Sequence, residues 1–109
     1  MVKEKRVEFI VEADVPALLF SSKAAAEYYL EEIDIVDGVY PRAFDRTGLV
    51  YDVIPEDGHG LLVAHVSQKC DVDRLVSVLQ ALLHSVGVLA SSDDTLFDLL
   101  DKAGPYLDR

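Results

Sequence analysis

The sequence predicts an α+β domain in which a small antiparallel sheet packs against two to three helices. Three observations support this prediction. Residues 6–13 alternate like a half-buried strand, residues 34–67 are divided by closely spaced turn signals, and residues 72–86 repeat apolar side chains at helical spacing. A chain of 109 residues can bury one core but is short for two, so we expect a single α+β domain over residues 1–109. Its elements, about four of them strands, should follow the order β-α-β-β-β-α-α.

The first strand is expected within residues 6–13. One of its faces is apolar and consists of Val7, Phe9, Val11 and Ala13. The other face carries Arg6, Glu8 and Glu12, and Ile10 is the apolar exception on it. Asp14 and Pro16 should end the strand, because proline has no backbone N–H to donate to a ladder.

A helix should follow, from the pair Ser21-Ser22 to about Glu32. Serine is a favoured N-cap, and three alanines come next. On a helical wheel, one face collects Ala26, Tyr29, Leu30 and Ile33. Tyr28 points nearly opposite Leu30, so it is either part of a second contact surface or simply exposed.

Three strands should lie at residues 39–44, 49–54 and 61–67. The turn signals around them are Asp37-Gly38, Asp45-Arg46-Thr47-Gly48 and Glu56-Asp57-Gly58-His59-Gly60. Connections this short favour antiparallel neighbours, and hence a meander. Pro41 indicates an edge position or a bulge for the first of the three strands.

Two further helices complete the prediction. Asp71 can cap the first, and Gly87 marks its end. The apolar face of that helix is Val72, Leu75, Val76, Leu79, Leu82, Leu83 and Val86. The second should begin at Ser91-Ser92-Asp93-Asp94, because the helix dipole favours acids in a first turn, and should stop at Gly104-Pro105. Helices that cover the apolar face of one sheet give a two-layer domain.

Acidity is the strongest bulk property of the chain. Its 20 acidic and 10 basic residues give a formal net charge of −10. Such a surface repels nucleic acid and anionic membranes and attracts basic partners, although acidity alone also keeps a small protein soluble. We therefore expect neither a nucleic-acid nor a membrane partner. No signal-type apolar stretch follows the charged residues 1–6, so a cytoplasmic location is expected.

No constellation in the sequence indicates catalysis. His59, His65 and His84 have no i, i+4 partner that would aim two rings at one metal ion. Cys70 is the only cysteine, which excludes an internal disulfide, and it is expected to be a packed or inert thiol. Acid pairs at predicted helix starts are explained by capping. We expect no catalytic residue, no metal and no cofactor, and hence no enzymatic activity.

The residues most typical of a binding surface lie between positions 27 and 57. The acids of this segment are Glu27, Glu31, Glu32, Asp34, Asp37, Asp45, Asp52, Glu56 and Asp57, and four of the five tyrosines share it. Tyrosine supplies rigid contact area and carboxylates attract a basic partner, although core tyrosines with a solvated acidic face would give the same pattern. The candidate partner-binding residues are Tyr28, Glu31, Glu32, Asp34, Asp37, Tyr40, Asp45 and Asp57.

Several short motifs follow one another between residues 24 and 51. They are a helix ending in Tyr29-Leu30-Glu31, an Ile33-Asp34-Ile35 strand, the turn Asp37-Gly38, the aromatic Tyr40, and the hairpin Ala43-Phe44-Asp45-Arg46-Thr47-Gly48. This arrangement, about a quarter of the chain, resembles small bacterial immunity proteins of polymorphic-toxin and contact-dependent growth inhibition systems. The resemblance implies a cytoplasmic protein that tightly binds and blocks a secreted toxin encoded beside it, often a nuclease.

The function predicted from the sequence is therefore an immunity protein that neutralises a cognate toxin. The toxin is expected to be basic, since nucleases must approach phosphates, and the protein itself to be a monomer or a weak homodimer. Two alternatives remain open. One is a small cytosolic adaptor or regulatory domain that self-associates through helix faces at residues 72–86 and 96–100. The other is a small hydrolase or isomerase that uses His59 or His65 with a carboxylate.

Overall fold

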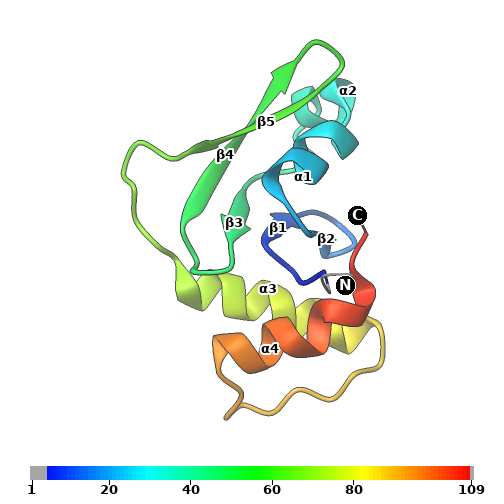
Figure 1. Cartoon of the computed structure of the whole chain (residues 1–109), viewed down its shortest axis with the longest axis vertical. Helices are drawn as coiled ribbons and strands as arrows, with labels where there is room; N and C mark the ends of the chain where they lie inside the picture. Colours follow the sequence, from blue (N-terminus) through cyan, green and yellow to red (C-terminus); the bar gives the residue numbers. More distant parts are fainter. Residues whose placement is uncertain (1–4, 109) are drawn as a thin grey trace, which may run out of the picture.

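Residues 5–108, the part of the chain that the computed structural model describes, form a five-stranded antiparallel sheet with helices on both faces (Figure 1). The strands are β1 (Phe9–Glu12), β2 (Ala17–Phe20), β3 (Ala43–Asp45), β4 (Val50–Glu56) and β5 (His59–Ala64), and their order in the sheet is β2-β1-β3-β4-β5. The helices are α1 (Lys23–Tyr29), α2 (Glu32–Val36), α3 (Val72–Ser85) and α4 (Leu96–Ala103), and a 3-10 turn, η1 (Gly104–Tyr106), follows. The predicted α+β class and antiparallel sheet are confirmed.

Each face of the sheet carries its own hydrophobic core, which corrects the expected two-layer arrangement. Ile10 packs with Phe44 and the buried residues of α3 and α4. Its neighbour Val11 belongs to a second cluster, which includes buried residues of α1 and α2. Consecutive strand residues point to opposite faces, so both are buried. This arrangement explains why Ile10 interrupts the apolar–polar alternation of the first strand.

The strand β2 is absent from the predicted order. The chain leaves β1 at Ala13, turns back, and pairs Leu19 opposite Ile10 and Phe20 opposite Phe9. Leu19 lies in the core under α3 and α4, whereas Phe20 lies in the core under α1 and α2. Because both faces of β2 are buried, its sequence has no polar alternation, and the periodicity that reveals a half-buried strand is missing.

The helix expected up to about Glu32 is divided into two. Ser22 caps α1 as predicted, and its Oγ accepts a hydrogen bond from the Ala25 N–H at 3.0 Å. Leu30 and Glu31 then adopt extended backbone, with ψ angles of 127° and 136°, and the chain bends before α2 begins.

The bend fits Leu30 and Ile35 around a glycine of β5. A β-carbon on Gly60 would lie 2.9 Å from Ile35 Cδ1 and 3.2 Å from Leu30 Cβ, so only glycine allows this approach without a shift of its neighbours. The expected strand at Ile33-Asp34-Ile35 is wrong, because these residues form part of α2.

The turns follow the sequence more closely. Asp57 and Gly58 join β4 to β5 with φ angles of 40° and 89°, as a two-residue type I′ hairpin requires. His59 and Gly60, which were expected in this turn, already belong to β5. Pro41 precedes β3, and β3 lies between β1 and β4, so the expected edge strand or bulge at Pro41 is wrong.

The caps of the last two helices were partly predicted. Asp71 Oδ1 accepts from the Arg74 N–H at 3.1 Å, and Gly87 follows α3 with a φ of 76°, as expected. The N-cap of α4 is Thr95, not a residue of the 91–94 segment, and Thr95 forms a reciprocal capping box with Asp98.

On each edge of the sheet, a carboxylate accepts a hydrogen bond from a strand N–H. On β2, the Leu19 N–H donates to Asp108 Oδ2 at 2.7 Å, and the Asp108 N–H donates to the Leu19 carbonyl at 2.8 Å. On β5, the Leu62 N–H donates to Glu27 Oε2 at 2.7 Å. Free edge groups are templates for pairing with other chains, so these contacts limit edge-to-edge association.

Candidate partner-binding surface

Helices α1 and α2 expose large apolar side chains between carboxylates. Tyr28 is 88% exposed, Ile33 66% and Val36 68%. Glu31 and Asp37 are exposed as well. We refer to these five residues as the α1–α2 face. Scattered exposed apolar residues are ordinary, but several on two adjoining short helices are typical of an interaction site.

The bend between the two helices produces this face. A continuous helix would have turned Ile33 toward the core together with Leu30. Since α2 restarts after the bend, Ile35 is the buried residue, whereas Ile33 and Val36 face solvent. Sequence reasoning missed Ile33 and Val36 as surface residues. The acidic first turn of α2, Glu32 and Asp34, was the available signal for a second helix start.

Two hollows lie on the α1–α2 face, one on each side of Glu31. One has a volume of about 510 Å³, and its lining residues are Ala25, Tyr28, Tyr29 and Glu31. The other has a volume of about 560 Å³, and its lining residues are Glu31, Glu32, Ile33, Val36 and Gly58. Hollows of this kind receive the anchor side chains of protein partners.

The electrostatic character of this region is acidic throughout. Residues 24–41 include five carboxylates and no lysine or arginine. Among residues 5–108, neither Glu31 nor Asp37 has a side-chain hydrogen bond or ion pair. Their charges are therefore available to a cationic partner.

Glu32, another predicted contact residue, holds the β4–β5 turn beside α2. Its Oε2 accepts from the Gly58 N–H at 2.6 Å, and its own N–H donates to the Gly58 carbonyl at 3.3 Å. The turn residue Asp57 is exposed, and it lies next to the α1–α2 face because the adjacent Gly58 is bonded to Glu32. Glu32 thus positions one wall of a hollow, and its carboxylate is already engaged.

Three more of the predicted contact residues, Asp34, Tyr40 and Asp45, are engaged within the fold. Asp34 Oδ2 accepts from the Tyr40 hydroxyl at 3.5 Å. Asp45 Oδ1 accepts from Thr47 N–H at 2.9 Å and from Thr47 Oγ1 at 2.5 Å, and its Oδ2 accepts from the Tyr51 hydroxyl at 3.3 Å. Asp45 therefore shapes the β3–β4 turn, which lies against the start of α3 and not beside the α1–α2 face.

The tyrosines divide into one exposed residue and three that pack. Tyr40 and Tyr51 are half-buried against the core under α1 and α2, and burial, followed by the nearby Asp34 and Asp45 respectively, raises the pKa of each phenol. Tyr29 stacks at a tilt on Phe20, with ring centroids 5.4 Å apart. Tyr28 alone among the tyrosines of this segment is a fully displayed aromatic side chain.

A histidine–carboxylate pair lies elsewhere, at the end of β5. His65 Nδ1 is 2.9 Å from Asp52 Oδ1, and the side chains are 44% and 47% exposed. Catalytic dyads of this kind need an adjacent nucleophile and a cavity. Neither residue lines the two hollows beside Glu31, the hollow between Val7 and Leu100, or the hollow between Glu12 and Val78. Cys70 is exposed, so of the two expected alternatives, a packed or an inert thiol, the packed one is wrong.

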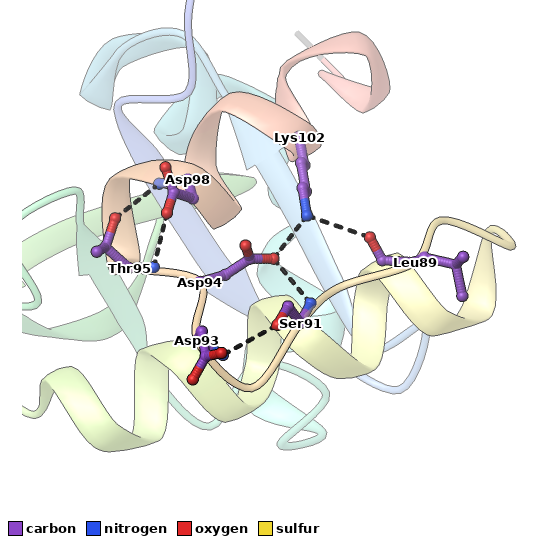
Figure 2. A network of polar contacts seen from close by, with 7 residues as sticks. All are labelled: Leu89, Ser91, Asp93, Asp94, Thr95, Asp98 and Lys102. Atoms are coloured by element: carbon purple, nitrogen blue, oxygen red, sulfur yellow. Dashed lines mark hydrogen bonds and ion pairs between the residues drawn. The ribbon is translucent and has the colours of Figure 1, made fainter.

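The connection between α3 and α4 contains a compact polar network (Figure 2). Its members are Leu89, Ser91, Asp93, Asp94, Thr95, Asp98 and Lys102. Lys102 Nζ lies 2.6 Å from Asp94 Oδ2 and 3.3 Å from the Leu89 carbonyl oxygen, and Asp94 also accepts from the Ser91 N–H at 2.9 Å. Hydrogen bonding to Lys102, followed by the Ser91 N–H, lowers the pKa of Asp94. Since Lys102, Asp94 and Ser91 bond to one another, the network anchors the connection between α3 and α4 to α4.

Residues 5–108 contain no group of three or more His, Cys, Asp or Glu side chains arranged to hold a metal ion. In the same part of the chain, no helix has the length and apolarity needed to cross a membrane. No protein-family model, curated protein or solved structure matches the chain.

Proposed function

We propose that this protein is an immunity protein that binds and neutralises a basic bacterial toxin through the α1–α2 face. The observation that supports the proposal best is the combination on one face of three exposed apolar side chains, Tyr28, Ile33 and Val36, with the unpaired carboxylates of Glu31 and Asp37. The apolar groups provide contact area, and the carboxylates attract and orient a cationic surface.

The net charge supports the same proposal. At a formal charge of −10, the protein attracts basic proteins over long range, and such steering accelerates association at low ionic strength. A nuclease toxin must carry a basic substrate-binding surface to approach phosphates, which makes it a natural complement. A cytoplasmic location forms part of the proposal, because the toxin must be met where it acts.

The resemblance to immunity proteins contributes less than these surface properties. The hairpin from Ala43 to Gly48 is present, with Asp45 shaping its turn. The motif Ile33-Asp34-Ile35, however, is helical and not a strand. The proposal therefore depends on the composition of the α1–α2 face more than on the order of the motifs.

Self-association through α3 and α4, the alternative suggested by their apolar patterns, has only part of those faces available, because Phe97 is 64% exposed but most of the other apolar residues are buried. The inward residues Leu75, Leu79, Leu83 and Leu99 are fully buried in the core beneath the sheet. An uncovered apolar region lies on β4 and β5, where the side chains of Ile54 and Val63 are about two-fifths exposed. We expect a monomer or at most a weak homodimer.

The proposal is tested by measuring binding to the product of the adjacent gene at low and high salt. We expect tight binding that weakens as salt screens the acidic surface. Tyr28→Ala should weaken binding by about 2 kcal/mol or more, as loss of a central aromatic anchor does, with less than about 0.5 kcal/mol change in stability. Phe97→Ala, at an exposed position of α4, is the matched control and should bind like the wild type. Absence of binding to the correctly folded neighbour contradicts the proposal.

A further inference from the structure

Glu31 lines both hollows of the α1–α2 face. Tyr28 and Tyr29 line the hollow on the α1 side, whereas Ile33 and Val36 line the hollow on the α2 side. The order across the surface is thus aromatic, carboxylate, aliphatic. Besides Glu31, the first hollow is lined by Ala25, Tyr28 and Tyr29, and the second by Glu32, Ile33, Val36 and Gly58. Both are open surface depressions that can take up a side chain of a partner.

Glu31 differs from Glu32 and Asp34 in making no side-chain hydrogen bond or ion pair with residues 5–108. Glu32 is bonded to Gly58, and Asp34 accepts from Tyr40. Glu31 sits at the N-cap position of α2 without making a side-chain capping hydrogen bond. Among residues 5–108, no hydrogen bond or ion pair holds the Glu31 carboxylate.

We propose that the α1–α2 face recognises a segment of the partner in which one arginine, paired with Glu31, is flanked by two large apolar side chains that enter the hollows. This inference rests on the proposed function and specifies the composition of the contact. Charge complementarity selects a cation, since residues 24–41 offer five carboxylates and no basic group.

Arginine fits this site better than lysine for two reasons. Its planar guanidinium makes paired hydrogen bonds to a carboxylate, and it also stacks on an aromatic ring. Glu31 and Tyr28 supply these two groups on the wall of one hollow. An ammonium group is more strongly hydrated and pairs with the carboxylate as a point charge, so it gains less from the aromatic surface.

Gly58 extends the contact beyond the two helices. It lines the α2-side hollow from the tip of the β4–β5 hairpin, and Glu32 fixes that tip at 2.6 Å. Glu32 is therefore a positioning residue. Glu32→Gln, which keeps the shape but weakens the charged hydrogen bond, should broaden specificity for the apolar side chain in this hollow.

The test uses a phage-displayed library of random 12-residue peptides selected on the immobilised protein. We expect enriched peptides to carry an arginine between two large apolar residues. Their synthetic forms should bind Glu31→Gln about tenfold more weakly, which corresponds to about 1.4 kcal/mol. Asp14→Asn removes the same charge in the β1–β2 turn, next to residues that face α3, and should leave binding unchanged. Replacement of the peptide arginine by lysine should weaken binding by a smaller factor.

Three results would overturn the inference: failure to enrich any peptide, enrichment of peptides without a cation, or equal binding to the wild type and Glu31→Gln. The adjacent gene product separates this inference from the proposed function. If that protein binds tightly and Glu31→Gln has no effect, the function stands and the inference fails. If the peptides behave as expected but that protein does not bind, the recognition chemistry stands and the proposed toxin partner fails.

Discussion

Replacement of Leu30 by alanine tests how the bend between α1 and α2 is held. Leu30 is fully buried in the core under these helices and lies at the close approach to Gly60. The substitution removes three buried carbons, worth about 2.4 kcal/mol at roughly 0.8 kcal/mol each. Gly60 has no side chain to fill the space, so a cavity should persist and increase the total loss to about 3 kcal/mol.

Urea unfolding followed by circular dichroism measures this loss. With an m value of roughly 1.5–2 kcal/mol/M, the midpoint should fall by about 1.5–2 M. The matched control is Leu89→Ala, because Leu89 is 92% exposed in the loop after α3. The same atoms are removed there without a cavity, and stability should change by less than about 0.5 kcal/mol.

A shift of the Leu30→Ala midpoint no larger than that of Leu89→Ala would refute the packing argument. It would mean that the bend is not fixed by contact with Gly60 and that the α1–α2 face is not rigidly presented. A large shift that leaves β4 and β5 protected from amide hydrogen exchange would instead show that α1 and α2 unfold separately from the sheet.

Three further substitutions test polar contacts of the fold. Asp94→Asn should reduce stability at neutral pH and make stability less sensitive to acid. A carboxyl whose pKa is lowered by Lys102 stabilises the fold above its ordinary pKa of 3.8, and this contribution is lost as the pH falls. Unfolding midpoints between pH 3 and 7 measure the difference. Glu27→Ala should lower the free energy of unfolding by about 1–3 kcal/mol, because the Leu62 N–H loses its acceptor. Hydrogen exchange at that amide should become faster, and unchanged exchange would exclude the edge contact. Tyr51→Phe should remove one late step from the alkaline absorbance titration and lessen the fall in stability above pH 10. Burial raises the pKa of this phenol, so above pH 10 the phenol ionises more readily in the unfolded chain and the fold is destabilised.

Capping and turn residues in the sequence correctly predicted those element ends that are held by neighbouring residues. Ser22 and Asp71 cap helices as expected, and Asp57-Gly58 forms the two-residue hairpin. Each depends on contacts a few residues away, so the sequence alone contains the information. The candidate surface was predicted in the same way at Tyr28 and Glu31, which are exposed, although the sequence left open whether the tyrosines were core or surface.

Long-range contacts decided the remainder. β2 is held by pairing with β1 and by Asp108, which bonds to Leu19 from 89 residues away. No periodicity reveals such a strand, because both of its faces are buried. Glu12, expected on a polar face, is buried and paired with Arg42 and Arg74 for the same reason: a helix covers that face of the sheet as well.

The amino-acid sequence by itself determined the α+β class, the acidic charge, the main caps and turns, and the acidic and aromatic character of the region around α1 and α2. Only the tertiary structure decided which of those residues are exposed and which are engaged within the fold. The bend at Leu30 follows from the space above Gly60, and the engagement of Glu32 follows from its bond to Gly58. Glu32 and Gly58 are 26 residues apart in the sequence, and Leu30 and Gly60 are 30 apart. Helical periodicity therefore could not reveal that Ile33 would be exposed and Ile35 buried.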